Sequence, residues 1–151
     1  MKGIKQFEEF IDEGIVKKQN PDISRATFLI EEVENSFEAL KETLEKIGTN
    51  DRNANSIVKQ CYDILMELVR AKMLTQGYNS TGRGAHEAEV SFLRMMHVPE
   101  QDVQFANQMR YFRNGITYYG RILDKKYADK VIRFTKRIYP LLKRTVDTPT
   151  N

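Results

Sequence analysis

The stretch Ile57-Val-Lys-Gln-Cys-Tyr-Asp-Ile-Leu-Met-Glu-Leu-Val-Arg-Ala-Lys-Met73 repeats apolar side chains every three or four residues. At 3.6 residues per turn, this spacing gathers those side chains into one stripe and predicts a helix near residues 56–76. Because Cys61 lies within the stripe, we interpret its thiol as a small core residue. The stripe consists of Ile57, Cys61, Ile64, Leu65, Leu68 and Met73.

Apolar residues at the same spacing predict five more helices, and turn-forming residues separate them. No run of residues alternates with period two, so the sequence predicts no strand. Ser24 is the expected N-cap of the second helix, and Gly48 is its expected C-terminal cap. The chain is therefore predicted to be all-α, an up-and-down helical bundle of four main helices plus a short helix. The expected helices cover residues 3–18, 24–47, 86–96, 101–119 and 125–144, and residues 145–151 are expected to be a frayed tail.

The 151 residues fit one domain, residues 1–151, and are enough to bury a core. Charged residues make up 30% and hydrophobic residues 40%, which is typical of a globular chain and excludes a disordered one. The 1 cysteine cannot form an internal disulfide, so the cytoplasm is the expected location. Early acidic residues argue against a signal peptide, and no apolar run approaches the roughly 20 residues of a membrane helix. We therefore expect no membrane partner.

The net charge of +3 is unevenly distributed along the chain. Residues 8–47 hold 11 Asp or Glu against 5 Lys or Arg, a net charge of −6. Residues 121–144 hold 9 Lys or Arg against 2 Asp, a net charge of +7. A basic segment of this kind attracts phosphates. The alternative is that the acidic and basic helices lie side by side in the bundle and neutralise each other.

The segment Arg110-Tyr-Phe-Arg-Asn-Gly-Ile-Thr-Tyr-Tyr-Gly-Arg121 places polar side chains on a helix face where packing does not require them. Like charges at this spacing cost on the order of a few tenths of a kcal/mol. A chain that keeps them can use the charge to meet an anion or a partner surface, and the alternative is a solvated basic face. On a helical wheel, the expected core stripe is Phe105, Met109, Phe112, Ile116 and Tyr119. The flank and the back carry Arg110, Arg113, Asn114, Thr117 and Arg121.

Several kinds of chemistry are excluded by residue type and spacing. The 2 histidines, His86 and His97, form no Glu-x-x-His pair, so a di-iron bundle is not expected. One cysteine and two separated histidines give no zinc site, and no serine triad is recognisable. We therefore expect neither a metal nor a cofactor. His86 at a helix start is interpreted as a capping or packed residue, with acid–base chemistry as the less common alternative.

The glycine-rich segment Gly77-Tyr-Asn-Ser-Thr-Gly-Arg-Gly84 is interpreted as an ordinary interhelical loop. A phosphate cradle at the start of the following helix is the alternative. The segment lacks the Gly-Lys-Ser/Thr ending of a P-loop, and no strand is predicted before it.

The arginine helix remains as the candidate functional region. A guanidinium binds phosphate through two parallel hydrogen bonds and stabilises developing negative charge, which makes Arg113 a candidate phosphate ligand. Asn114 can orient a phosphate or a sugar hydroxyl. Tyr118 lies one helical turn after Asn114, but tyrosine is a poor base at neutral pH because its ordinary pKa is about 10.

These residues resemble the HEPN family of all-helical nucleotide-binding domains. The family signature is Arg-Asn followed within a few residues by histidine near the end of a helix. Arg113-Asn114-Gly-Ile-Thr-Tyr118 occupies that pattern here, with Tyr118 where the family has histidine. The resemblance covers roughly residues 25–144 and includes Cys61-Tyr62-Asp63, Leu68-Val69-Arg70-Ala71, Gly77-Tyr78, Gly84-Ala85-His86-Glu87-Ala88 and Phe92-Leu93.

The resemblance implies a homodimer in which two Arg-Asn motifs face one cleft. Many members resemble metal-independent ribonucleases, often toxins paired with a small nucleotidyltransferase, and others have lost the histidine and bind RNA or a nucleotide. The resemblance also implies that Arg113, Asn114 and Tyr118 form a degenerate catalytic motif. From the wheel alone, Arg110 and Arg121 are added to Arg113 and Asn114 as residues that bind nucleic acid.

We therefore compare three hypotheses about function. The first is a HEPN-type protein that binds RNA or a nucleotide with a degenerate ribonuclease motif and is the partner of a nucleotidyltransferase. The second is an active metal-independent ribonuclease toxin of a toxin–antitoxin pair, in which another group replaces the missing histidine. The third is a structural helical interaction module with a solvated basic face.

Overall fold

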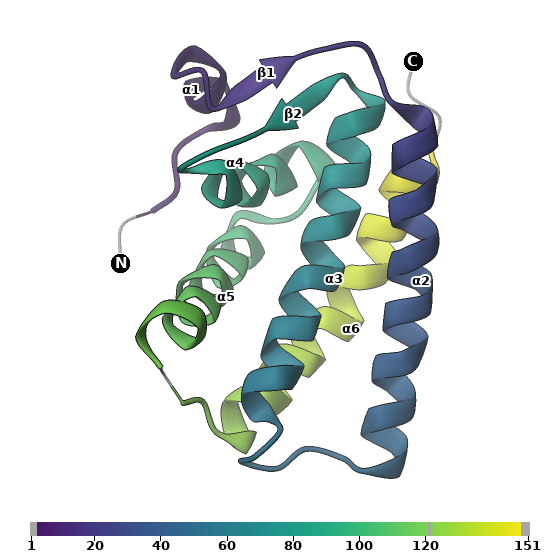
Figure 1. Cartoon of the computed structure of the whole chain (residues 1–151), viewed down its shortest axis with the longest axis vertical. Helices are drawn as coiled ribbons and strands as arrows, with labels where there is room; N and C mark the ends of the chain where they lie inside the picture. Colours follow the sequence, from purple (N-terminus) through teal and green to yellow (C-terminus); the bar gives the residue numbers. More distant parts are fainter. Residues whose placement is uncertain (1–2, 121, 149–151) are drawn as a thin grey trace.

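The computed structural model describes residues 3–120 and 122–148, with the side chains of residues 117–119 excepted. Over these residues the chain is an all-α bundle with one small two-stranded sheet (Figure 1). The predicted fold class is confirmed. The elements are α1 Phe7–Asp12, β1 Val16–Lys18, α2 Ile23–Lys46, α3 Ala54–Thr75, β2 Tyr78–Ser80, α4 Ala85–Phe92, the 3₁₀ helix η1 Leu93–Met96, α5 Glu100–Tyr119 and α6 Lys125–Asp147.

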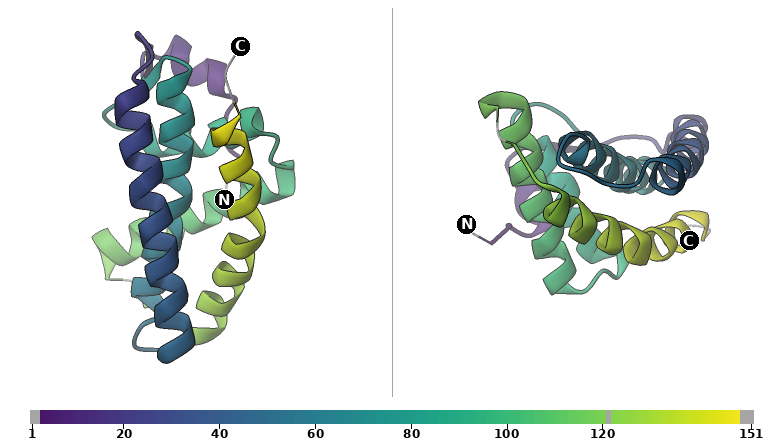
Figure 2. Two further views of the ribbon diagram at one scale, coloured as in Figure 1. Left: turned by 90° about the vertical axis from the view of Figure 1, so that its right-hand side faces the viewer. Right: turned by 90° about the horizontal axis from the view of Figure 1, so that it is seen from below.

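Helix α3 lies at the centre of the molecule. It packs against α2, α4, α5 and α6, and over residues 60–74 its side chains are buried except along one polar stripe formed by Gln60, Asp63, Glu67 and Arg70. Figures 1 and 2 show α2 running alongside α3, α6 crossing behind it, and α4 and α5 on the side away from α2. Cys61 is 0% exposed, which confirms its place in the core. A helix that is covered over most of its circumference is apolar over most of its surface, as this sequence is.

The acidic helix α2 and the basic helix α6 both pack on α3 and meet along one edge. The rings of Phe37 and Tyr139 stack with centroids 3.8 Å apart, and Lys143 Nζ lies 3.1 Å from Glu34 Oε1. At this edge the acidic and the basic segment partly neutralise each other. This agrees with the alternative interpretation of the charge pattern, in which the acidic and basic helices lie side by side. The helix α6 extends to Asp147, three residues beyond the predicted end at residue 144.

The N-terminal part of the chain differs from the prediction. The expected helix over residues 3–18 is wrong, because the helix α1 ends at Asp12 and Gly14 adopts a left-handed φ of +77°. The expectation of no strand is also wrong. Strand β1 pairs antiparallel with β2, from Val16 opposite Ser80 to Lys18 opposite Tyr78. Strands of three residues are too short to show an alternating pattern, and their pairing partner lies far away in the sequence.

The expected cap of α2 also changed. Asp22, not Ser24, caps α2, since its side chain accepts a hydrogen bond of 3.0 Å from the Arg25 amide. Helix α5 continues through the buried Gly115 and ends at Gly120, which has a φ of +66°. The arginine segment is therefore one helix up to its last turn.

Candidate functional site

The side chains of Arg110 and Arg113 face the neighbouring helices. They are 16% and 23% exposed, so the interpretation that they lie on a helix face with no role in packing was wrong for these two residues. The buried stripe of α5 runs through Val103, Ala106 and Met109. The wheel shows which residues share a face of the helix, but it contains no information about which face a neighbouring helix will cover. Phe105, Phe112 and Ile116, expected in the core stripe, are only partly buried.

Arg113 reaches across to α3. Its Nη2 lies 3.4 Å from Asp63 Oδ1, and the centre of its guanidinium lies 5.9 Å from the ring centre of Tyr62. Arg110 stays close to its own helix, where its Nε donates a hydrogen bond of 3.0 Å to Asn107 Oδ1. Its Nη1 lies 3.9 Å from Glu87 Oε1 of α4.

The remaining predicted site residues are only partly placed. Asn114 is half-buried on α5. Arg121 lies outside the described residues, and so does the side chain of Tyr118, although its backbone belongs to the last turn of α5. The structure therefore brings Arg110 and Arg113 together with groups from α3 and α4.

Tyr62 lies at the centre of these charges. Its side chain is 1% exposed, and its hydroxyl has no hydrogen-bond partner among the described residues. Burial raises the pKa of Tyr62 well above its ordinary value, and the negative charge of Glu89 adds to this. The positive charges of Arg110, Arg70 and Arg113 oppose the shift. One buried ring is thus surrounded by four charged side chains from three helices.

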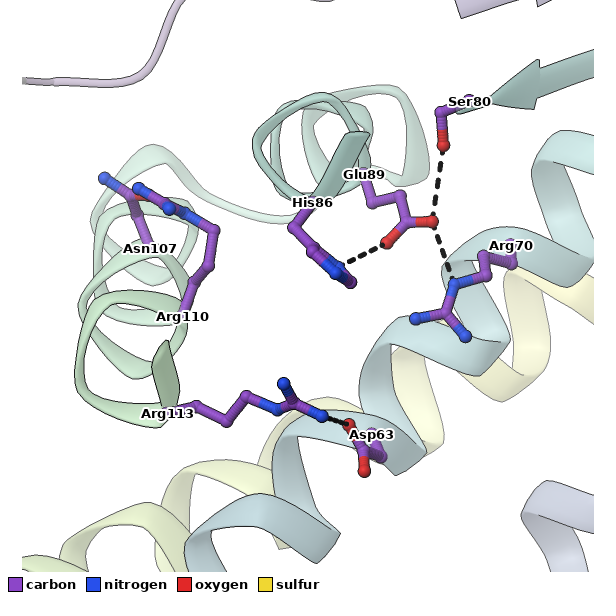
Figure 3. A network of polar contacts seen from close by, with 8 residues as sticks. All are labelled: Asp63, Arg70, Ser80, His86, Glu89, Asn107, Arg110 and Arg113. Atoms are coloured by element: carbon purple, nitrogen blue, oxygen red, sulfur yellow. Dashed lines mark hydrogen bonds and ion pairs between the residues drawn. The ribbon is translucent and has the colours of Figure 1, made fainter. Parts of the chain in front are cut away.

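Glu89 of α4 holds a second part of the network together. Its side chain is 5% exposed, and its Oε2 accepts hydrogen bonds from Arg70 Nε at 2.8 Å and from Ser80 Oγ at 3.3 Å. Its Oε1 lies 3.4 Å from His86 Nδ1. The i,i+3 spacing on α4 puts His86 and Glu89 on one face. Strand β2 brings Ser80 to the same place, so the small sheet contributes to the site (Figure 3).

A pocket of about 400 Å³ opens beside Glu89, between α3, β2 and the start of α4. Hydrophobic side chains such as Leu29 and Met73 form part of its wall. The glycine-rich loop supplies Thr81 and Gly82. The charged and polar side chains of the lining are Arg25, Arg70, Asn79, Ser80, Thr81, His86 and Glu89.

The ion pairs in this region differ in length. Arg70 and Glu89 are 2.8 Å apart, whereas the contacts of Arg113 with Asp63 and of Arg110 with Glu87 are 3.4 and 3.9 Å. Charge-assisted hydrogen bonds have lengths of about 2.7–2.9 Å. The contacts of Arg110 and Arg113 with these two carboxylates are therefore longer than charge-assisted hydrogen bonds.

Part of this site was visible in the sequence and part was missed. The segments that carried the resemblance contain Tyr62, Asp63, Arg70 and His86, but no role was attached to the first three, and His86 was interpreted as a capping or packed residue. Glu89 and Ser80 were missed. The His86-x-x-Glu89 spacing and an arginine within the apolar helix α3 were available as signals. Nothing in the sequence indicated that β2 would lie beside α4.

Among the described residues, no group of three or more His, Cys, Asp or Glu side chains is arranged to hold a metal ion. No helix in the described part of the chain is long and apolar enough to cross a membrane. Comparison with models of protein families, with curated proteins and with solved structures finds no match to this chain.

Proposed function

We propose that this chain is a HEPN-type protein that binds RNA or a nucleotide through Arg113 and Arg110. The observation that carries the proposal is that Arg70, Arg110 and Arg113 belong to one polar network from α3 and α5 (Figure 3), in which the carboxylate contacts of Arg113 and Arg110 are 3.4 and 3.9 Å long. A phosphate offers several acceptor oxygens and suits the fork of a guanidinium better than one distant carboxylate oxygen does.

The proposal includes a homodimer in which the two Arg-Asn motifs face one cleft. Exposed apolar side chains lie beside the motif, since Tyr111 is 49% and Ile122 is 83% exposed. An interface formed beside the motif would bury these two side chains. A nucleotidyltransferase as partner and the cytoplasm as location belong to the same proposal, and both rest on the resemblance and on the cysteine content.

The test is RNA binding by the wild type and by Arg113→Ala, measured by fluorescence anisotropy with a 30-nucleotide single-stranded RNA. We expect affinity to fall about tenfold or more, since a hydrogen bond to a charged group contributes about 1.5–3 kcal/mol. The dependence of log affinity on log salt should flatten by about 0.7 for the lost phosphate contact. The Asp63 pair is too weak for its loss to unfold the protein.

Arg52→Ala is the matched control, because it removes the same charge from an exposed position at the start of α3. It should leave affinity within about twofold of the wild type. Equal affinity of Arg113→Ala and Arg52→Ala for RNA, and for ATP tested as a free nucleotide, would contradict the proposal. The hypothesis of a structural helical module predicts this equal affinity. The observation that favours that hypothesis is that acidic groups face the arginines, namely Asp63, Glu87 and Glu89.

A further inference from the structure

The pocket between α3, β2 and the start of α4 lies outside the arginine segment of α5, and the proposed function assigns it no ligand. We infer that it binds a small monocarboxylate with an apolar body, whose carboxylate meets the guanidinium groups of Arg70 and Arg25. The pocket has a volume of about 400 Å³, which is within the range of small-molecule sites. Binding here is independent of RNA binding, because neither Arg110 nor Arg113 lines this pocket.

The guanidinium of Arg70 is held in place while most of its donors stay unused. Its Nε donates a hydrogen bond of 2.8 Å to Glu89 Oε2, and Ser80 Oγ, 3.3 Å away, donates to the same oxygen. Arg70 makes no other hydrogen bond with the described residues. Figure 3 shows its two Nη nitrogens on the side away from Glu89, and neither is buried. Because an arginine carries five donors in a fixed fork, the free edge can hold a carboxylate through two parallel hydrogen bonds.

Other arginines of the chain use this edge for the fold. Arg94 donates through all three of its side-chain nitrogens, to one carboxylate and two backbone carbonyl oxygens. Arg137 donates through Nη1 and Nη2 to both oxygens of one carboxylate. In Arg70 the contact with Glu89 fixes the side chain through Nε and leaves the Nη edge open. A donor that is oriented before the ligand arrives loses little freedom when the ligand binds.

The charges of the lining favour a ligand with a single negative charge. By formal charge, Arg25 and Arg70 are positive and Glu89 is negative, which gives a net charge of +1 when His86 is counted as neutral. Arg70 and Glu89 form an ion pair, so the excess positive charge belongs to the exposed Arg25. A monocarboxylate balances this excess. A phosphate dianion would leave one negative charge uncompensated near Glu89, and like charges placed together oppose binding.

Part of the lining suits an apolar body. Leu29 of α2 and Met73 and Leu74 of α3 form this part of the wall, and the two residues of α3 belong to the buried core. Moving apolar surface out of water favours binding. Asn79 and Thr81 add neutral donors and acceptors to the lining. A short fatty acid or a phenyl-substituted acid has the matching combination of one carboxylate and one apolar body.

The test is isothermal titration calorimetry of the full chain with hexanoate and with phenylacetate. We expect saturable binding of at least one of them with a Kd of about 1 mM or below, which ligands of this size can reach. Hexanol has the apolar body without the charge, and acetate has the charge without the body. Each should bind about 5-fold more weakly than hexanoate or worse, because each lacks one of the two contacts. Hexyl phosphate should also bind more weakly than hexanoate.

Two variants and one control assign the binding to this pocket. Arg70→Lys keeps a positive charge beside Glu89 but removes the fork, so affinity should fall about 10-fold or more, as expected for a lost hydrogen bond between charged groups. Arg25→Ala should weaken binding about 3-fold, since an exposed charge contributes less. Arg52→Ala removes the same charge from an exposed position outside the pocket and should bind as the wild type does.

Amide chemical shifts of the wild type locate the ligand without any substitution. Residues 79–82 line the pocket, so their amide signals should move during titration with the acid that binds. Absence of binding by both acids up to about 10 mM would overturn the inference. Equal binding of hexanol or acetate, stronger binding of hexyl phosphate, or shifts confined to residues outside the pocket would overturn it as well. RNA affinity is measured separately, so each of these outcomes leaves the proposed function standing.

Discussion

The arginines of this chain fall into two groups by the length of their ion pairs. Arg94 donates to both carboxylate oxygens of Glu100 at 2.7 and 2.8 Å, and Arg137 does the same with Asp102 at 2.8 and 3.0 Å. These are bidentate pairs that hold elements in place. The contact of Arg113 with Asp63 is longer and not bidentate, because Arg113 Nη2 lies 3.4 Å from Asp63 Oδ1. Arg94 and Arg137 thus serve the fold through short bidentate pairs, whereas Arg110 and Arg113, with longer carboxylate contacts, are the proposed ligand-binding residues.

The pair of Arg94 and Glu100 predicts how stability depends on pH. Arg94 also donates to the carbonyl oxygens of Ile4 and Lys5, so it ties the N-terminal segment to the start of α5. Hydrogen bonds from Arg94, and then from Gln104, lower the pKa of Glu100 to about 2. Its unfolded pKa is about 4.3. The contribution of this carboxylate is therefore present above about pH 4.3 and is lost as pH falls towards about 2.

Glu100→Gln should show this dependence directly. Because the side chain is largely exposed, we expect a small loss of stability at pH 7. Thermal unfolding of the wild type and the variant, measured by circular dichroism between pH 6 and pH 2, should converge as the pH falls. A difference in thermal stability between the two proteins that grows on acidification would contradict the stabilising role of the Glu100 carboxylate.

At the scale of elements, periodicity predicted the helices because the information is local. The stripes of α2, α3, α5 and α6 are each contained within one segment, and their boundaries agree with the structure to within a few residues. The ribbon of β1 and β2 was missed because its two strands are about 60 residues apart and are held by tertiary contacts. Phe7, for example, packs edge-on against Phe92 and Tyr78, at 4.9 and 5.2 Å.

Gly77 is the residue that makes this ribbon possible. It has a φ of +80°, and a Cβ at this position would lie 2.5 Å from the carbonyl oxygen of Gln19. Its own carbonyl accepts a hydrogen bond of 2.8 Å from the Gln19 amide. Gly77→Ala should therefore destabilise the fold by about 1–3 kcal/mol, the cost of strain in this region combined with the close contact.

Gly14→Ala is the control for Gly77→Ala, because Gly14 has a similar φ of +77° and open space around its Cβ position. The measurement is urea unfolding of both variants. A loss in Gly77→Ala clearly larger than that in Gly14→Ala isolates the close contact, and equal losses would mean that left-handed strain alone matters.

For the whole molecule, the candidate site depends on contacts among α3, β2, α4 and α5. The sequence predicted Arg110 and Arg113 from the arginine segment, but the partners Asp63, Ser80 and Glu89 come from elements whose arrangement is not local. A helical wheel also could not predict which neighbouring elements the side chains of Arg110 and Arg113 would contact. A helical wheel shows which residues share a face, and tertiary packing decides what that face meets.

The proposed homodimer gives the last prediction. Ile122 is 83% exposed and lies just after α5, so an interface formed beside the Arg-Asn motif would bury it. Ile122→Asp should shift a dimer towards monomer in sedimentation velocity, because burying an unpaired carboxylate at an interface is costly. Ile23→Asp is the control, since Ile23 is 58% exposed at the start of α2. A wild type that is monomeric at every concentration, or a dimer that Ile23→Asp weakens and Ile122→Asp does not, would contradict this interface.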